Sequence, residues 1–166
     1  MNSAKTKIKD ISNIELYLRR IAYQIYENNE DKELIIVGVE KNGELLANKI
    51  FEILKSISNF KLTLITLKIN KEQPANKIKS SIDKEICLNK TVVIVDDVLN
   101  TGRTLIYAVK YFLNIPVKKI QTAVIINRNH KKFPIKADFK GISLSTTLKE
   151  HVDVVLEGSK KGIYLS

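Results

Sequence analysis

Through the middle of the chain, short runs of apolar residues alternate with stretches whose apolar residues recur at helical spacing. An uninterrupted apolar run is typical of a strand that is buried on both faces of a sheet. Alternation of such strands with helices is typical of parallel β-α-β units. The sequence therefore predicts an α/β fold, an open and mainly parallel twisted sheet with helices on both faces. The expected strands are residues 34–39, 62–69, 92–95 and 120–126, with short strand-like pieces at 152–156 and 163–165, and the expected helices are 12–28, opened by a capping box of Ser12 and Glu15, 44–57 and 105–113.

The chain reads as one domain covering residues 1–166. No internal repeat, low-complexity tract or Gly/Ser linker divides it, and its length suits a single core. One segment, from about residue 68 to 90, is rich in lysine and contains Pro74. A long polar segment of this kind predicts a flexible loop.

Composition excludes several classes of protein. No apolar run is long enough to cross a bilayer, and the polar first residues do not form a signal peptide. A lone Cys87 forms no internal disulfide, and His130 and His151 are too few for a zinc cluster. We therefore expect a cytoplasmic protein that does not bind membranes. The formal charge of +10 suits a nucleic acid or a polyphosphate substrate, although only four of the 28 basic residues are arginines, which also fits a compositional bias towards lysine.

The carboxyl ends of two expected strands carry the residues of chemical interest. In open α/β sheets, ligands bind beyond the carboxyl ends of the strands. This rule brings residues 38–43 and 96–104 to the same rim of the sheet. The second segment belongs to the run VVIVDDVLNTGRTL, Val92 to Leu105, in which two aspartates end a buried strand and a polar loop follows at once.

Spacing excludes two common interpretations of this run. A haloacid-type phosphatase needs Asp-x-Asp-x-Thr, but the third position of the window that starts at Asp97 is Leu99. A P-loop needs a glycine five positions before its Gly-Lys-Thr, and Asp97 occupies that place before Gly102. A Walker-B aspartate has no Walker-A partner elsewhere in the chain.

A sugar phosphate fits the run. Asp96 and Asp97 are acceptors suited to two neighbouring ribose hydroxyls. The successive amides of residues 99–104, ahead of a helix N-terminus, form an anion-binding concavity. Thr101 and Thr104 add hydroxyl donors, and Gly102 leaves room for the phosphate.

The run resembles the phosphoribosyl-pyrophosphate motif of the type I phosphoribosyltransferases: an apolar strand, two acidic residues, two apolar residues, a variable residue, then Thr-Gly and Thr. VGVEKNGELLA, Val37 to Ala47, resembles the pyrophosphate loop of that family, in which a cis peptide bond would join Glu40 and Lys41. Nearly the full length is similar to the PyrR-type group of pyrimidine-operon regulators and uracil phosphoribosyltransferases. The run NRNHKKFPIKADFKGISLSTTLKEHVDVVLE resembles the "hood" of that group, a small C-terminal part at about residues 127–166.

The resemblance implies a reaction. A nucleobase attacks C1 of phosphoribosyl pyrophosphate, pyrophosphate leaves, and Mg²⁺ binds through the diphosphate. It also implies a homo-oligomer, either a dimer or a tetramer, and a loop at 68–90 that closes over the site. The implied catalytic residues are Asp96 and Asp97, which also bind the ribose. The residues implied to bind the 5′-phosphate are Leu99, Asn100, Thr101, Gly102, Arg103 and Thr104, and those implied to bind the pyrophosphate are Glu40, Lys41, Asn42 and Gly43. The residues implied to lie near the base are Arg128, Thr146 and Thr147.

The base and the partners are less constrained. Asn100 stands where the 6-oxopurine members have an aspartate, which argues against hypoxanthine or guanine. The resemblance to the PyrR-type group implies uracil, although that group usually has an aromatic residue at this position. Leu148 replaces an arginine of the uracil group, so another base stays an alternative. A second alternative is an RNA-binding regulator of transcriptional attenuation that uses the site as a nucleotide sensor, with Arg19 and Arg20 as RNA contacts. A scaffold with an inactive site is the alternative that the intact motif supports least.

Overall fold

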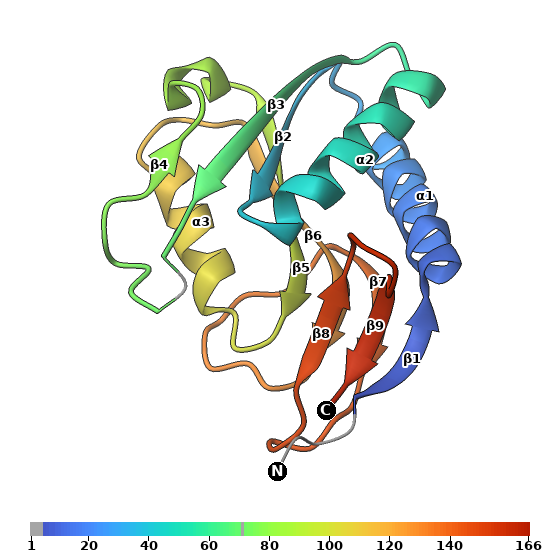
Figure 1. Ribbon diagram of the computed structural model, residues 1–166. Helices are drawn as coiled ribbons and strands as arrows, with labels where there is room; N and C mark the ends of the chain where they lie inside the picture. Colours follow the sequence, from blue (N-terminus) through green and yellow to red (C-terminus); the bar gives the residue numbers. More distant parts are fainter. Residues whose placement is uncertain (1–4, 71) are drawn as a thin grey trace.

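A computed structural model describes residues 5–70 and 72–166. Its main sheet has six strands in the order β4-β3-β2-β5-β6-β7, all parallel except β4, which runs antiparallel to β3. The expected open, mainly parallel sheet is therefore confirmed (Figure 1). The strands are β2 (Glu33–Val39), β3 (Lys61–Lys68), β4 (Lys79–Ser80), β5 (Thr91–Leu99), β6 (Lys119–Arg128) and β7 (Phe139–Leu144).

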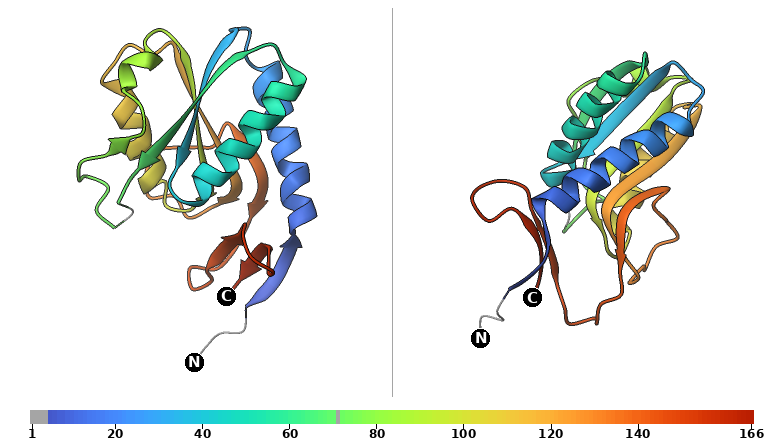
Figure 2. Two further views of the ribbon diagram at one scale, coloured as in Figure 1. Left: turned by 45° about the horizontal axis from the view of Figure 1, so that its top comes forward. Right: turned by 90° about the vertical axis from the view of Figure 1, so that its right-hand side faces the viewer.

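Helices cover both faces of the main sheet, as expected. α1 (Ile11–Glu27) and α2 (Asn42–Ile57) pack on one face, and α3 (Arg103–Leu113) packs on the other (Figures 1 and 2). Strand β2 shows why its sequence is apolar throughout. Leu34 and Ile36 point into the core under α1 and α2, whereas Ile35 and Val37 point into the core under α3. A strand that is buried on both sides has no place for a polar residue.

The expected end of β5 and the expected N-cap of α1 were wrong. The strand predicted for residues 92–95 continues to Leu99, because Asp96, Val98 and Leu99 still pair with β6. The two aspartates therefore lie inside the strand rather than after it. α1 begins at Ile11, and its N-cap is Asp10, whose backbone N–H donates to Oδ1 of Asn13 at 3.1 Å. The capping box therefore consists of Asp10 and Asn13 rather than of the predicted Ser12 and Glu15.

A second, antiparallel sheet joins segments from far apart in the sequence. It contains β1 (Thr6–Asp10), β9 (Gly162–Leu165) and β8 (Val152–Val155), in the order β1-β9-β8. The two expected short strands are confirmed as β8 and β9, but β1 was not expected. β7 was not expected either, and it joins the main sheet. The second sheet lies beyond the carboxyl end of the main sheet (Figure 1).

The lysine-rich segment 68–90 contains more regular structure than a loop prediction implies. It includes β4 and a 3₁₀ turn at Lys84–Cys87, and the N–H of Ser81 donates to the carbonyl of Thr66 at 3.0 Å. Lys71, within this segment, lies outside the described residues, as do residues 1–4. None of the helices in the described ranges combines the length and the apolar character that crossing a membrane requires.

Candidate active site

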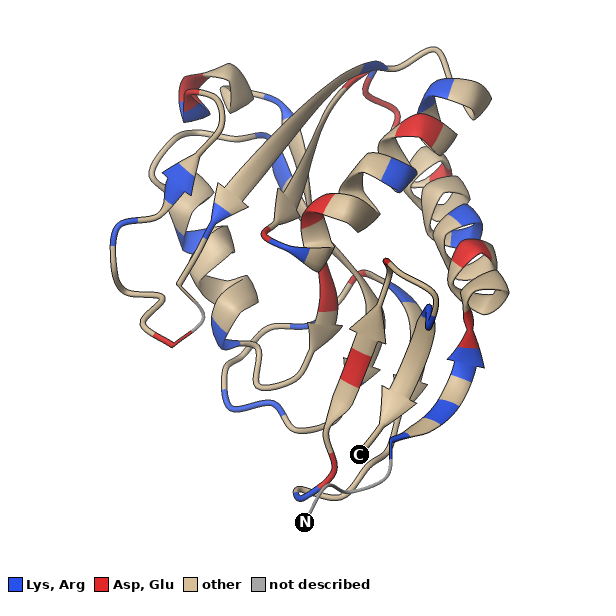
Figure 3. Ribbon diagram, viewed as in Figure 1, with Lys and Arg blue, Asp and Glu red and all other residues tan. Residues whose placement is uncertain are grey.

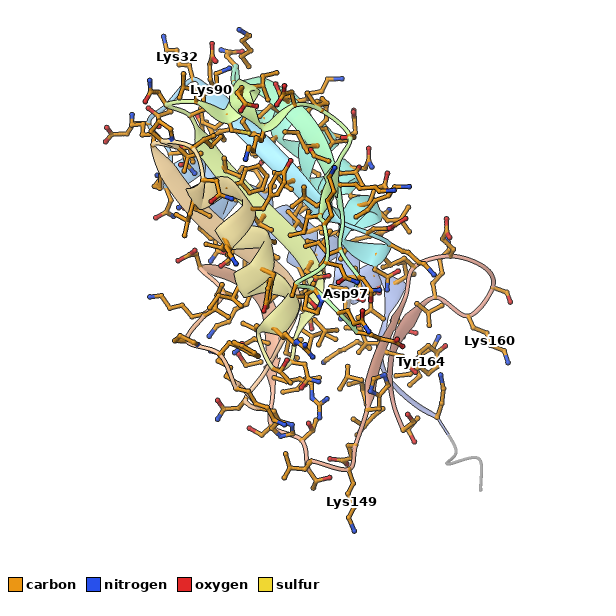
Figure 4. All side chains as sticks on the ribbon, turned by 90° about the vertical axis from the view of Figure 1, so that its left-hand side faces the viewer. Lys32, Lys90, Asp97, Lys149, Lys160 and Tyr164 are labelled. Carbon is orange, nitrogen blue, oxygen red and sulfur yellow. The ribbon has the colours of Figure 1, made fainter. Side chains whose placement is uncertain are left out.

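The rim of the main sheet brings together two segments that follow neighbouring strands. β2 and β5 are adjacent and parallel, yet the chain leaves β2 towards β3 on one side and later returns to β5 on the other. At such a reversal the loops that follow the two strands diverge and leave a crevice. Residues 40–42 and 100–102 border this crevice, as the strand pattern predicts. Figure 4 shows Asp97 at the junction of the two sheets, far from Lys32 and Lys90 at the opposite end.

The segment after β2 is a tight turn into α2. The peptide bond between Glu40 and Lys41 is cis, as the resemblance implied. The N–H of Glu40 donates to the carbonyl of Leu67 at 2.9 Å, and the Glu40 carboxylate lies 3.7 Å from Nζ of Lys68. Lys41 is exposed at the start of α2. Glu40, Lys41 and Asn42 line a pocket with Asp97 and with Ile69, which the sequence did not point to.

Gly43 lets α2 approach β5 closely. A Cβ atom built on Gly43 would lie 2.6 Å from the carbonyl oxygen of Val95 and 3.2 Å from Cα of Asp96. Both neighbours are backbone atoms of a central strand, which cannot move aside easily. The absence of a side chain at Gly43 therefore sets the distance between the segment after β2 and the two aspartates.

Backbone amides orient the carboxylates of Asp96 and Asp97. Asp96 is buried, and its Oδ1 accepts from the N–H of Asp97 at 2.9 Å. Asp97 is half-buried, and its Oδ1 accepts from the N–H of Val98 at 2.8 Å. Its Oδ2 accepts from Nδ2 of Asn42 at 2.8 Å. Both aspartates are thus fixed before any ligand arrives.

The segment after β5 forms a concavity at the N-terminus of α3. It is lined by Asp96, Val124 and residues 98–105, which include every residue predicted for the 5′-phosphate. Gly102 is the N-cap, with a left-handed φ of +82° that favours glycine. The first amides of a helix have no intrahelical acceptor, and the N–H of Arg103 donates instead to Oγ1 of Thr101 at 3.3 Å.

A loop at residues 132–135, which lies within the expected hood but contains none of the predicted site residues, supports this concavity. The carbonyl of Thr101 accepts from the N–H groups of Lys132 and Phe133 at 2.9 and 3.1 Å. A Cβ on Gly102 would lie 2.5 Å from Cγ2 of Ile135. Gly102 is therefore required for its backbone conformation and for packing against this loop.

Arg128, Thr146 and Thr147 form a separate cluster. Arg128 is only 3% exposed, so it is not a solvated surface charge. Its guanidinium donates to Oγ1 of Thr146 at 2.7 Å and to the carbonyls of Thr147 and Glu150 at 3.3 and 2.9 Å. Nη2 of Arg128 also lies 3.3 Å from Nδ1 of His130, whose Nε2 lies 2.7 Å from the carbonyl of Thr146. These contacts fix the loop after β7.

The same loop contains a carboxylate that the sequence did not single out. The N–H of Thr147 donates to Oε2 of Glu150 at 2.6 Å, and this hydrogen bond lowers the pKa of Glu150. None of Arg128, Thr146 and Thr147 lines either of the two rim pockets described above.

The two arginines of α1 differ in their surroundings. Arg20 donates to the backbone carbonyls of Lys140 and Gly141, and its guanidinium carbon lies 5.5 Å from the centroid of the Tyr17 ring. Arg19 is exposed and borders a groove between α1 and α2. Lys and Arg residues are spread over several elements, among them α1, β1, β4 and α3, rather than gathered on one (Figure 3).

The residues that line the two rim pockets carry carboxylates, amides, hydroxyls and cationic groups, which suit electrostatic rather than covalent chemistry. Cys87 lies before β5, at the end of the sheet away from the rim, and burial raises the pKa of its thiol to about 11. Within the described ranges, no group of three or more His, Cys, Asp or Glu side chains is arranged to hold a metal ion. The carboxylates of Glu40 and Asp97 line one pocket, and Mg²⁺ commonly binds through one or two carboxylates together with the phosphates of a substrate.

Comparison with known proteins identifies close relatives of the chain. A family model described as the phosphoribosyl transferase domain matches residues 4–157. A protein of Brevibacillus brevis named "Bifunctional protein PyrR" is 38% identical over 162 residues, which cover 92% of this chain and 90% of that protein. A protein of Staphylococcus aureus with the same name is 35% identical, with 90% and 91% covered.

Solved structures confirm the fold. A hypoxanthine-guanine phosphoribosyltransferase from Bacillus anthracis has a TM-score of 0.75 at 18% identity and covers 90% of this chain and 88% of its own. A hypoxanthine phosphoribosyltransferase from Trypanosoma cruzi has a TM-score of 0.70 at 15% identity, with 84% and 81% covered.

Proposed function

Because the chain belongs to the phosphoribosyl transferase domain family, we propose that it transfers the 5-phosphoribosyl group of phosphoribosyl pyrophosphate to a nucleobase and releases pyrophosphate. The observation that carries this proposal is the pair of pockets that meet at Asp96 and Asp97. Asp96 lines the concavity before α3, and Asp97 lines the pocket at the start of α2. Neighbouring carboxylates between two anion-binding segments suit a ribose that has a phosphate on each side.

The residues around the rim divide the work of binding. Asp96 and Asp97 accept hydrogen bonds from the ribose hydroxyls, and their negative charge stabilises an oxocarbenium-like ring. The amides of residues 99–104 bind the 5′-phosphate, together with the Thr101 and Thr104 hydroxyls. Lys41, with the turn at residues 40–43, binds the pyrophosphate as its charge grows. Catalysis then depends on positioning and on preorganised charge.

Mg²⁺ enters this scheme with the substrate. When bound, the ion neutralises the leaving diphosphate. The carboxylates of Glu40 and Asp97 are the oxygen donors of the chain beside the proposed diphosphate position. The lysine-rich segment 68–90 starts at this pocket and would cover it, excluding the water that hydrolyses the activated sugar.

Uracil is the base that we propose. Asn100, in the concavity, has no carboxylate to exchange a proton with a purine ring nitrogen. The relatives named for PyrR point in the same direction. The proposed hood, residues 127–166, closes over the base, and Arg128 keeps its loop in shape by holding Thr146 and Thr147.

An assay of product formation tests both the reaction and the base. We expect UMP and pyrophosphate from uracil, phosphoribosyl pyrophosphate and Mg²⁺, measured by liquid chromatography, and no nucleotide from hypoxanthine or guanine. A nucleotide from another base would retain the transferase and replace the base. No product with any base, at high enzyme concentration, would overturn the proposed reaction.

RNA-dependent regulation of pyrimidine genes is the second candidate function. The formal charge of +10, the exposed Arg19 and the word "bifunctional" in the names of the relatives favour it. We expect a pyrimidine-operon leader RNA to bind with an affinity that falls steeply with salt, because each phosphate contact releases counterions. Arg19→Ala should lower the salt dependence, as followed by filter binding. Equal affinity for an unrelated RNA of the same length would contradict this function.

We also propose that the chain is a single phosphoribosyltransferase domain that assembles as a dimer or tetramer in the cytoplasm. Exposed apolar side chains such as Leu16 and Leu113, 64% and 65% exposed, are suited to contacts between copies. The single, buried Cys87 fits a reducing compartment.

A further inference from the structure

The side chain of Asn42 joins three elements at the rim. Asn42 is the first residue of α2, and its Nδ2 donates to Oδ2 of Asp97 in β5 at 2.8 Å. The same Nδ2 donates to the carbonyl of Val154 in β8, also at 2.8 Å. A side-chain amide nitrogen carries two N–H donors. Both donors are therefore used, one on each side of the junction between the main sheet and the second sheet.

The first of these bonds sets the plane of the Asp97 carboxylate. Oδ1 of Asp97 is already held by the N–H of Val98 at 2.8 Å. With Oδ2 held by Asn42, the group is fixed at both oxygens. Each carboxylate oxygen can accept more than one hydrogen bond, so a ribose hydroxyl still finds an acceptor. Such a group needs little reorganisation when charge develops on the substrate.

The second bond attaches the second sheet to the same point. Val154 lies in β8, which pairs with β9, and β9 pairs with β1. The side chain of Val154 is 7% exposed and belongs to the core under α1 and α2. When β8 is packed in this way, the carbonyl of Val154 faces the side chain of Asn42. If β8 moved away, the amide would lose one of its two acceptors and its fixed orientation.

We infer that Asn42 is a positioning residue that couples the second sheet to the orientation of Asp97, so that the carboxylate is aligned for the ribose only while β8 is packed on the rim. This role rests on the proposed function and adds to the backbone contact with pyrophosphate that was expected of the same residue. It acts through Asp97 and involves no contact between the Asn42 side chain and the substrate.

Two substitutions of Asn42 and one control test the inference. Asn42→Ala removes both donors, and Asn42→Asp keeps the shape but puts a negative charge against Asp97. The control is Asn48→Ala in the same helix, because Nδ2 of Asn48 donates to the carbonyl of Glu44, one turn earlier in α2, at 3.0 Å. We expect Asn42→Ala to raise the KM for phosphoribosyl pyrophosphate about tenfold, with a smaller effect on kcat. Asn42→Asp should raise it further, and Asn48→Ala should leave it unchanged.

Hydrogen exchange measures the link to the second sheet without substrate. In Asn42→Ala, the amides of β8 and β9 should exchange faster, whereas those of β6 should match the wild type and Asn48→Ala. Unchanged exchange in β8, or an unchanged KM in both Asn42 variants, would overturn the inference. If the wild type itself failed to bind phosphoribosyl pyrophosphate, the proposed function would fail, and the exchange result would still decide whether Asn42 holds β8.

Discussion

Replacing both Asp96 and Asp97 by asparagine is expected to abolish the binding of phosphoribosyl pyrophosphate. Each carboxylate that accepts from a ribose hydroxyl contributes a charge-assisted hydrogen bond of about 1.5–3 kcal/mol, so the loss of two should weaken binding by about 100-fold or more. In Asp97→Asn, the side-chain NH₂ group that replaces Oδ2 would face Nδ2 of Asn42, and these two hydrogen-bond donors would repel each other. Isothermal titration of the double variant measures the loss.

The fold should survive this double substitution. The backbone N–H groups of residues 97 and 98 donate to Oδ1 of Asp96 and of Asp97. The side-chain oxygen of an asparagine can accept the same hydrogen bonds. The matched control is Asp31→Asn with Glu33→Gln, which removes two charges at the opposite end of the sheet, where Asp31 pairs with Lys118 and Glu33 with Lys61. The control should bind like the wild type. Unchanged affinity in the Asp96 and Asp97 variant would refute the assignment of the site.

Gly43→Val should inactivate the enzyme without removing any polar group. The added side chain would start 2.6 Å from the carbonyl oxygen of Val95, so the N-terminus of α2 must move away from β5. Overpacking of this kind costs about 1–3 kcal/mol of stability. The displacement separates Lys41 from the aspartates, and a shift of about 1 Å in a site can cost about 100-fold in rate.

Steady-state kinetics and thermal unfolding together test this expectation. Asn48→Val is the control, because Asn48 is exposed in the same helix and the substitution adds the same branched side chain away from β5. It should lower helix stability slightly and leave kcat/KM unchanged. Wild-type activity in Gly43→Val would mean that the spacing between α2 and β5 does not matter for the reaction.

Local sequence patterns were sufficient for the four central strands of the main sheet, β3, β2, β5 and β6, and for the two rim segments, but not for its outer strands β4 and β7. Uninterrupted apolar runs identify β2 and β5 because their side chains enter two cores at once. Residues that belong to a contiguous motif, such as 99–104, stay together in the structure because a few residues of chain cannot separate them. The sequence could not give the end of β5, because Asp96 and Asp97 interrupt its apolar run although the strand continues to pair with β6 as far as Leu99.

The features that the sequence did not indicate depend on contacts between distant segments. β1 is a polar strand, and it forms because β9 offers it a partner. The side-chain bonds of Asn42 require β8 to lie beside α2, which no spacing within either segment implies. Arg128 was expected near the base from its position in the chain, but its burial and its four partners follow from the path of residues 146–150.

Thr6 of β1 pairs with Leu165 of β9, and β9 pairs with β8, so β8 is supported by strands from near both ends of the described residues. Under our proposal, Asn42 holds Asp97 and β8 together. Weaker pairing between β1 and β9 would therefore loosen β8 and, through Asn42, the orientation of Asp97.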